Sequence, residues 1–324
     1  MMRKQLGALT ARRAFGLCAC WVVVGLALGG AQPAWADDDD IVNANGFEPT
    51  APYGFSTTFI GTGQLEGQIN PPGEGQAIPP GQWLRTKNVG ASTAFVQNTV
   101  FAPGGGTQAV KVDRAANSDV RWAVPVNALG YPDYPNPAPP EPAQPCICIT
   151  WDMRVEHSLG NGDSTFGPFF GVEAYDDDGN PVGLLGSLGV DAATGEVLYQ
   201  AAGSGFLTPT GSMVGFGQWN KFQMKLDYST HQYSVLLNGS MLGTIGFVDQ
   251  NNISGGLDQF SDADIAAVSA AGNAASLALT GTAYYDNFLV REGTCEVVPE
   301  PSTMAVVGVG LALFSGLRRR RSVK

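Results

Sequence analysis

Residues 221–247 decide the fold that this sequence predicts, and they read KFQMKLDYSTHQYSVLLNGSMLGTIGF. Apolar residues at every second position from 222 to 228, with polar residues between them, are typical of a half-buried strand. A second strand, predicted at residues 232–237, runs into Asn238-Gly239, a dipeptide that favours both central positions of a type I′ turn. The chain then returns through residues 242–247, so the stretch predicts an antiparallel β-hairpin.

The same alternation recurs on both sides of this hairpin. Residues 146–155 place five apolar side chains on one face, which are Ile147, Ile149, Trp151, Met153 and Val155. Further strands are predicted at residues 45–48, 95–101, 108–112, 121–126, 169–175, 182–190 and 197–200. The last predicted strand, residues 283–290, is apolar on both faces, so we expect it in the middle of a sheet.

One segment has the features of a helix. Residues 261–271 read SDADIAAVSAA, in which Ser261 suits the N-cap and acidic residues occupy the first turn. We therefore expect an all-β body with this single short helix.

The body between the two ends of the chain is strongly acidic. Of the 18 Lys and Arg residues, four lie in the first 36 residues and five in the last 28, whereas nearly all of the 29 Asp and Glu residues lie between them. The resulting net charge near −20 argues against nucleic acid and anionic lipid as partners and makes divalent cations relevant. Its length suits one large β domain, residues 45–296.

The N-terminal segment, residues 1–36, is typical of a cleavable signal peptide. A basic start precedes an apolar stretch, and Ala34 and Ala36 are the small residues that signal peptidase requires just before Asp37. Arg12-Arg13-Ala14-Phe15 is similar to the twin-arginine pattern, so the general secretory route and export in the folded state both stay open. Residues 37–44 are expected to be a solvated acidic linker.

The C-terminal segment, residues 297–324, has three parts in a fixed order. Pro299, Glu300 and Pro301 come first, an apolar run over residues 304–317 follows, and Arg318, Arg319, Arg320 and Arg321 end it. As a helix that run would be about 21 Å long, shorter than the roughly 30 Å hydrocarbon core of a bilayer. We therefore expect this segment to anchor the protein in the membrane only transiently, with the arginines on the cytoplasmic side and the body outside.

This tail resembles the PEP-CTERM sorting signal of Gram-negative bacteria, with the V-P-E-P-S-T motif, the apolar span and the arginine cluster in register. The resemblance implies recognition by an exosortase, cleavage near Pro-Glu-Pro, and release or attachment at the cell surface. The protein would be anchored in the inner membrane only transiently. An ordinary C-terminal membrane anchor is the alternative.

The body resembles a concanavalin A-like lectin or glucanase, as in laminin-G-like domains. The resemblance is carried by Phe47-Glu48, residues 63–68, Gly217-Gln218-Trp219, the hairpin, and Tyr285-Asp286-Asn287-Phe288. It implies a two-sheet jelly-roll β-sandwich, flanked here by the signal peptide and the C-terminal hydrophobic helix. Galactose-binding-like jelly rolls also end in a strand that contains an aspartate.

The motifs of common enzymes do not occur in the sequence. Glycosidases of this superfamily use carboxylates on one strand, usually as E-x-D-x-E, and the nearest candidate here, Glu173 with Asp176, has an odd separation that points the side chains to opposite faces. His157 and His231 both lie in polar loop contexts, so we expect them at the surface. The sequence therefore predicts a protein that is not an enzyme and requires no cofactor.

Glu48 and Asp286 form a candidate calcium site. The resemblance implies that the first and last strands are neighbours, and related carbohydrate-binding modules place a structural calcium ion between such carboxylates. Oxygen ligands suit this hard cation. The alternative is that Asp286 accepts hydrogen bonds from loop backbone and Glu48 is solvated. Residues 176–179, Asp-Asp-Asp-Gly, read more simply as a turn than as a calcium loop.

Three cysteines remain after export, namely Cys146, Cys148 and Cys295. A bridge between Cys146 and Cys148 would be strained, because Cα atoms two residues apart on a strand are about 6.5 to 7 Å apart. We expect Cys148 to pair with Cys295, with Cys146 as the alternative partner, and three reduced cysteines also stay open.

No cluster of aromatic residues marks a sugar site, so the ligand-binding residues are unknown from sequence. Trp151 and Trp219 are expected in the core. The remaining candidates for an exposed platform are Trp83, Trp122, Tyr131, Tyr134 and Tyr228. The function expected is that of an exported, surface-sorted, non-enzymatic protein associated with extracellular polysaccharide. The alternatives are a structural matrix or surface protein without glycan affinity, and an unrecognised glycoside hydrolase.

Overall fold

The computed structural model describes residues 40–48, 63–69, 81–104, 106–125, 146–158, 167–177, 182–254, 256–269 and 274–293. All of them belong to the larger of the two units into which the chain divides, residues 35–324. The predicted signal peptide, the sorting tail with its apolar run, Cys295, Tyr131 and Tyr134 lie outside the described residues. Among the residues described, no helix is long and apolar enough to cross a membrane.

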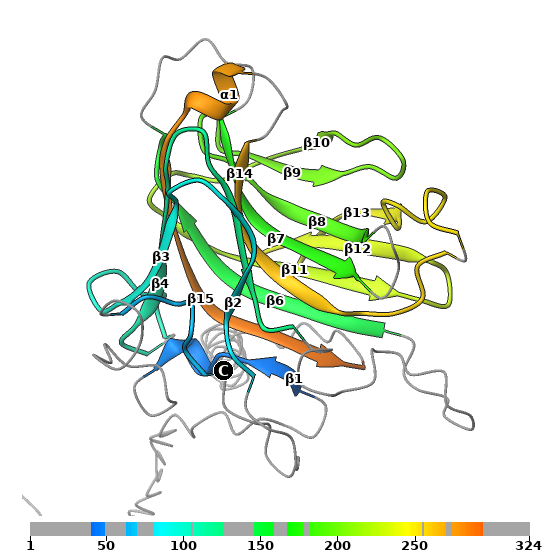
Figure 1. The fold of residues 1–324 in the computed structure, drawn as a ribbon, viewed down its shortest axis with the longest axis horizontal. Helices are drawn as coiled ribbons and strands as arrows, with labels where there is room; N and C mark the ends of the chain where they lie inside the picture. Colours follow the sequence, from blue (N-terminus) through cyan, green and yellow to red (C-terminus); the bar gives the residue numbers. More distant parts are fainter. Residues whose placement is uncertain are drawn as a thin grey trace, which may run out of the picture. The chain divides into compact units, whose positions relative to one another are not determined.

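The strands form two antiparallel sheets, as the sequence predicted (Figure 1). The eight-stranded sheet has the order β13-β12-β11-β6-β15-β4-β3, and β1 also pairs with β15. Its strands are β1 (Asp40–Asn43), β3 (Thr93–Gln97), β4 (Ala109–Arg114), β6 (Cys146–Val155), β11 (Trp219–Asp227), β12 (Gln232–Leu237), β13 (Ser240–Gly246) and β15 (Gly281–Glu292).

The seven-stranded sheet has the order β10-β9-β8-β7-β14-β5-β2. Its strands are β2 (Leu84–Val89), β5 (Asp119–Ala123), β7 (Pro168–Asp176), β8 (Gly183–Asp191), β9 (Glu196–Gln200), β10 (Leu207–Met213) and β14 (Asp262–Ser269). Two short helical segments, η1 (Asn45–Phe47) and α1 (Ala274–Ala278), complete the described elements. The fold is therefore an all-β, two-sheet antiparallel sandwich with one short α-helix.

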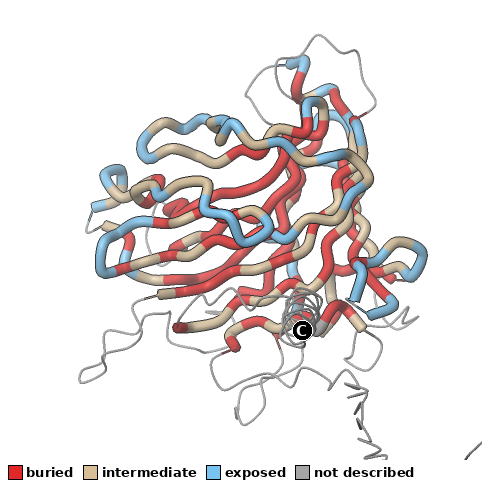
Figure 2. Tube along the Cα trace, turned by 180° about the vertical axis from the view of Figure 1, so that it is seen from behind, coloured by how far each residue is buried: buried red, intermediate tan, exposed pale blue. Residues whose placement is uncertain are grey.

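One hydrophobic core fills the space between the sheets. The five apolar side chains predicted on one face of β6 are all buried in it, and Trp151 stacks on Phe222 of the neighbouring β11 with ring centroids 5.6 Å apart. Tyr285 of β15 crosses the core and donates its hydroxyl to the carbonyls of Gly171 and Ala266 in the other sheet, at 3.2 and 3.3 Å. Buried residues accordingly run along the central strands and exposed ones gather in the turns (Figure 2).

The hairpin predicted at residues 221–247 has the expected geometry. Asn238 and Gly239 both have positive φ, 49° and 78°, as a type I′ turn requires. The Asn238 side chain also accepts a hydrogen bond from the Lys221 amide at 2.9 Å, which ties the turn to the start of β11. Strand β15 lies between β6 and β4, so its predicted central position is confirmed.

The predicted helix at residues 261–271 is wrong. Residues 262–269 form β14, which pairs with β7 on one side and β5 on the other. Ser261 does not cap a helix; its hydroxyl accepts a hydrogen bond from the Asp177 amide at 2.9 Å. Alanine favours helices only weakly over strands, and pairing on both edges with burial of nearly every residue overrides that preference. The short helix is α1 instead.

The N-terminal part of the body also differs from the prediction. The segment expected as a first strand instead contains the tight turn η1, in which Gly46 and Phe47 both adopt positive φ, 65° and 57°, values that a strand does not allow. Asp40 was expected in a solvated linker but begins β1, is buried, and forms an ion pair with Arg291 at 2.9 Å. Strands β2 and β10 were not predicted, because Gly, Pro and polar residues mask their alternation.

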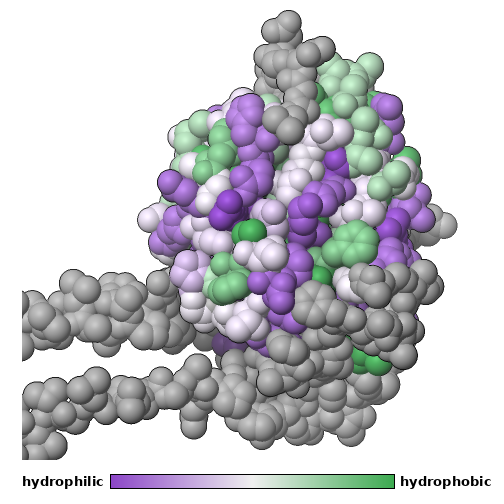
Figure 3. Space-filling model, turned by 90° about the vertical axis from the view of Figure 1, so that its left-hand side faces the viewer, coloured by the Kyte–Doolittle hydropathy of each residue, from purple (hydrophilic) through white to green (hydrophobic). Residues whose placement is uncertain are grey.

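The surface of the body mixes polar and apolar residues. On the side that carries β3 and β4, hydrophilic and hydrophobic residues are interspersed (Figure 3). Among the described residues, the most exposed large apolar side chains are Phe206, Met213 and Met241, which lie in or next to the edge strands β10 and β13.

Candidate functional site

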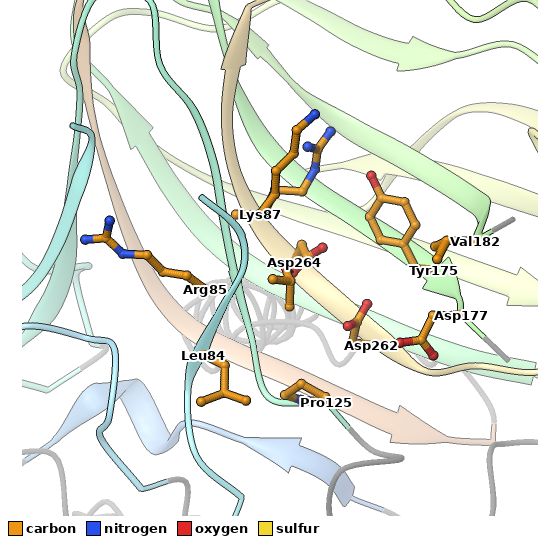
Figure 4. Close-up of a pocket in the computed structure, with 11 residues that line it drawn as sticks. Leu84, Arg85, Lys87, Pro125, Tyr175, Asp177, Val182, Asp262 and Asp264 are labelled. Carbon is orange, nitrogen blue, oxygen red and sulfur yellow. Dashed lines mark hydrogen bonds between the residues drawn. The ribbon is translucent and has the colours of Figure 1, made fainter. Parts of the chain in front are cut away.

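A pocket of about 600 Å³ opens on the outer face of the seven-stranded sheet, where β2, β5, β7 and β14 lie side by side (Figure 4). We call it the sheet-face pocket. Its lining residues are Leu84, Arg85, Thr86, Lys87, Arg121, Pro125, Tyr175, Asp177, Val182, Asp262 and Asp264. Neighbours along β7 and β14, such as Val172 and Ile265, point into the core, so the pocket side chains point away from it.

Strand register brings the chemical groups of this pocket together. In the pairing of β7 with β14, Glu173 lies opposite Asp264 and Tyr175 lies opposite Asp262. Side chains two residues apart on a strand share a face, so all four belong to the outer face of the sheet. Arg121 joins them from β5, on the other side of β14.

Glu173 is held inside a hydrogen-bonded group. The Arg121 Nε and the Tyr175 hydroxyl, the latter at 3.1 Å, both donate to the same oxygen, Glu173 Oε2. The Arg121 guanidinium also lies 5.8 Å from the centroid of the Tyr175 ring. Burial, followed by the charge of Glu173, raises the pKa of the Tyr175 phenol well above its ordinary value, so the phenol stays protonated and donates.

Asp264 and Asp262 lack a comparable cation. The Thr86 hydroxyl donates to Asp264 Oδ1 at 2.6 Å, and burial raises the pKa of Asp264 to about 7 despite that bond and the charge of Arg121. Burial, with the charges of Asp264 and Asp177, raises the pKa of Asp262 well above its ordinary value. Asp262 Oδ1 is buried and has no hydrogen-bond partner among the described residues. The pocket therefore holds two buried carboxyl groups that no salt bridge with a described residue neutralises.

Sequence reasoning missed this site. The glycosidase motif places its carboxylates along one strand, whereas these come from two strands that are far apart in the chain. Asp262 and Asp264 were read as the first turn of a helix, although their spacing of two residues is the strand signal that would have found them. Asp176, earlier considered with Glu173, accepts hydrogen bonds from the Asp258 and Gln259 amides, both at 3.1 Å.

The candidate calcium residues both accept hydrogen bonds from the loop between β3 and β4. Asp286 is fully buried in β15, and its two oxygens accept hydrogen bonds from the Ala102 and Asn287 amides, both at 2.8 Å. Glu48 accepts hydrogen bonds from the Thr107 amide at 2.6 Å and the Gln108 amide at 2.9 Å. These bonds match the alternative for Asp286, whereas Glu48 is bonded to backbone rather than simply solvated.

The same residues fit a calcium ion through their charge. Burial raises the pKa of Asp286 to about 8, and the carboxylates of Asp152 and Glu48 add to the effect. A divalent cation would supply the missing positive charge. The described residues hold no group of three or more Asp, Glu, His or Cys side chains suited to a metal, so backbone oxygens and water would complete the coordination. The calcium site stays a prediction.

The cysteines of β6 differ from each other. Cys148 is buried and disulfide-bonded, and Cys146 is a free thiol, which excludes a bridge between the two. Because Cys295 lies outside the described residues, its pairing with Cys148 stays a prediction.

Most of the proposed aromatic platforms are core residues. Trp83, Trp122 and Tyr228 are buried, and Trp83 packs against Phe288 with ring centroids 5.5 Å apart. Trp151 is buried as expected, but Trp219 is only partly buried, because it is the first residue of β11 and lies at the end of the sheet. Tyr175, which lines the sheet-face pocket, was not among the candidate platforms predicted from the sequence. His157 and His231 are exposed, as predicted.

Comparison with known families and structures adds one specific match. The family description of the PEP-CTERM protein-sorting motif matches residues 297–321. The chain carries this sorting signal. The match confirms the interpretation of the tail and implies an exported protein that is sorted to the cell surface and processed by an exosortase. No curated protein matches the chain by sequence.

Several solved structures are similar to part of the chain. "Cellulose induced protein, Cip1" is 13% identical, with a TM-score of 0.42, over 66% of this chain and 90% of that one. A Trypanosoma rangeli sialidase is 12% identical, with a TM-score of 0.40, over 70% of this chain and 32% of that one. The alginate lyase Aly36B, in complex with alginate trisaccharide, is 10% identical, with a TM-score of 0.37, over 57% and 82%.

Proposed function

We propose that this chain is an exported, surface-sorted, non-enzymatic protein that associates with extracellular polysaccharide through the sheet-face pocket. The observation that carries the proposal is the pocket itself, which combines an aromatic ring, apolar walls and several polar side chains in one open space of about 600 Å³. This volume lies within the range of ligand sites, roughly 300 to 1,000 Å³. A sugar ring needs such a mixture, because its C–H face packs on apolar groups while its hydroxyls bond to polar ones.

Three hydrogen bonds support binding rather than catalysis. Glu173 Oε2 already accepts hydrogen bonds from Arg121 and Tyr175, and Asp264 Oδ1 accepts one from Thr86. These oxygens are therefore engaged with the protein. Such bonds fix the shape of the pocket and leave it suited to holding a ligand.

Glycoside hydrolysis is the second candidate, and one specific observation favours it. Glu173 and Asp264 lie opposite each other on adjacent strands, Glu173 is bonded to Arg121, and the pKa of Asp264 is raised to about 7. Retaining glycosidases use two such carboxyl groups, one ionised and one protonated. In that case Glu173 would be the nucleophile and Asp264 the general acid.

A glycan array with the full chain, purified in mild detergent, tests the proposal. We expect Tyr175→Ala to lower binding at least tenfold, while Tyr284→Ala, which changes a tyrosine on the other sheet, leaves it unchanged. Release of reducing ends that is abolished by Glu173→Gln would favour the hydrolase. Absence of binding to any glycan would favour the structural matrix or surface protein.

A further inference from the structure

One end of the sheet-face pocket is acidic. Asp177, Asp262 and Asp264 form this acidic end, and in Figure 4 Asp262 and Asp177 lie next to each other with Asp264 close by. The amino group of Lys87 points away from them in the same view. The pocket therefore has its negative groups at one end, on β14 and just after β7.

The basic residues of the lining do not neutralise this end. Arg121 is paired with Glu173, and Arg85 is paired with Glu66 at 2.7 Å. Lys87 is exposed and forms no ion pair with any described residue. Asp262 and Asp264 form no salt bridge with any of the residues that the structure describes.

Asp262 is the residue that points to a ligand. It is only 5% exposed, lines the pocket, and its Oδ1 has no hydrogen-bond partner among the described residues. A buried carboxyl oxygen without a partner is costly, so a native protein keeps one chiefly where something else completes it. The missing group is a hydrogen-bond donor that carries positive charge.

An ammonium group matches this requirement better than a metal ion does. Within the described residues no group of three or more Asp, Glu, His or Cys side chains is arranged for a metal. A primary ammonium presents three N–H donors and no acceptor, so it can bond to the carboxyl group of Asp262 and to the carboxyl groups beside it at once. Charge-assisted bonds of this kind are about twice as strong as neutral ones.

The walls of the pocket favour an amine that is attached to a sugar ring. Leu84, Pro125 and Val182 provide apolar surface, and Tyr175 provides an aromatic ring with a hydroxyl. When the nitrogen of an amino sugar reaches the acidic end, the ring that carries it lies against these walls. The flexible side chain of a lysine would not fill the same space.

We infer that the sheet-face pocket recognises a polysaccharide with unacetylated amino-sugar units, whose ammonium group binds at the acidic end. This inference rests on the proposed function and names its ligand class. N-acetylated units carry no charge to offset Asp262, and uronic acids would place like charge against it.

Binding should also release protons. The charged and titratable groups around the ligand are Lys87 and Arg85 from β2, Arg121 from β5, Glu173, Tyr175 and Asp177 from β7 and its end, and Asp262 and Asp264 from β14. Of these, Asp262 and Asp264 both have raised pKa values, that of Asp264 being about 7, so the acidic end retains protons at neutral pH. An ammonium group nearby favours the ionised carboxylate and expels its proton.

Isothermal titration of the full chain in mild detergent tests the inference at pH 6, where the amino groups of hexaglucosamine are largely protonated. The probes are hexaglucosamine, its fully N-acetylated form, an alginate hexamer and hexalysine. We expect hexaglucosamine to bind at least tenfold more tightly than the N-acetylated form, alginate not to bind, and hexaglucosamine to release protons, seen as a heat that depends on the buffer.

Two variants connect the preference to the acidic end. We expect Asp262→Asn to weaken hexaglucosamine at least tenfold while leaving the N-acetylated form within twofold, and Asp258→Asn, a change at an exposed aspartate, to alter neither. If Asp262→Asn does not fold, Asp177→Asn at the same end should reduce the preference instead. The comparison of the two sugars requires no variant.

Three outcomes would overturn the inference. Equal affinity for the two hexasaccharides would show that the ammonium group is not recognised. Saccharide binding, and with it the proposed function, would still stand. If hexalysine binds as tightly as hexaglucosamine, and this binding also depends on Asp262, the ligand is a cationic peptide rather than an amino sugar. Absence of binding to every saccharide would end both the inference and the proposed function.

Discussion

Replacement of Asp286 by asparagine distinguishes two contributions to the stability of the fold: the free-energy cost of ionising a buried carboxyl group, and the hydrogen bonds that its two oxygens accept. Asp286 is fully buried and its pKa is raised to about 8, whereas an aspartate in the unfolded chain has a pKa of about 3.9. Between these values the folded protein holds a proton that the unfolded chain has lost. The free energy of unfolding therefore falls by about 1.4 kcal/mol per pH unit as the pH rises through this interval.

Asparagine removes this proton but also one acceptor. The two carboxyl oxygens of Asp286 accept hydrogen bonds from the Ala102 and Asn287 amides, and asparagine can accept only one of them. The lost bond should cost about 1 to 3 kcal/mol at every pH. We therefore expect Asp286→Asn to be the less stable protein at pH 5, and the difference to shrink by about 2.7 kcal/mol between pH 5 and pH 7.

Urea unfolding at pH 5, 6 and 7 in the presence of a chelator measures this difference. Asp262 and Asp264 also have raised pKa values, but they are present in both proteins and cancel in the comparison. The exposed Asp258→Asn is the matched control and should run parallel to the wild type. If the Asp286→Asn curve is parallel as well, Asp286 ionises normally and the reasoning fails.

A second arm at pH 8 tests the calcium site of Glu48 and Asp286. A ligand that binds only the folded state stabilises it by about 2.7 kcal/mol at a hundredfold excess over its Kd. We expect calcium to raise the melting temperature of the wild type above the rise in sodium chloride of equal ionic strength, and magnesium to substitute poorly. This calcium-specific part should vanish in Asp286→Asn. Equal shifts in both salts would leave Asp286 as a hydrogen-bond acceptor only.

Three further predictions concern the tail, the thiols and the core. Mass spectrometry of the mature protein should find a C-terminus without the arginine cluster, and deletion of residues 304–324 should abolish surface retention without loss of the fold. Peptide mapping should find Cys148 linked to Cys295 and Cys146 alkylated in the native protein; a linked Cys146 would contradict this. Phe222→Ala should lower the free energy of unfolding by about 3 to 5 kcal/mol in urea titrations, because it empties a fully buried ring site.

Local sequence predicted those strands in which apolar and polar residues alternate clearly, with one face buried and the other exposed to solvent. The alternation in β11 and the dipeptide Asn238-Gly239 each carry their own geometry, so strand and turn could be read without knowledge of the neighbours. β14 could not be read in this way, because it is covered on both faces and its alanines and aspartates also satisfy the rules for a helix start. Only its pairing with β7 and β5 decides its conformation.

The candidate site was less accessible to prediction for a related reason. Glu173 and Asp264 are opposite each other only because β7 and β14 are neighbours, and the sequence of neither strand indicates that the two strands pair. The single-strand motif of the glycosidases is a property of the sequence, whereas a site shared between strands is a property of the sheet order. The raised pKa of Asp264 likewise follows from burial, which alternation alone does not give.

Strand β15 is the last described strand to be synthesised, yet it lies between β6 and β4 in its sheet. Until it arrives, each of those strands has an open edge, and β1 lacks the strand with which it pairs. The sorting motif begins at residue 297, shortly after β15 ends at Glu292. In a chain that is exported unfolded, the body therefore closes only when the motif has already reached the membrane. Folding and processing would then be timed by the same few residues, so that a body still lacking its final strand cannot be released early.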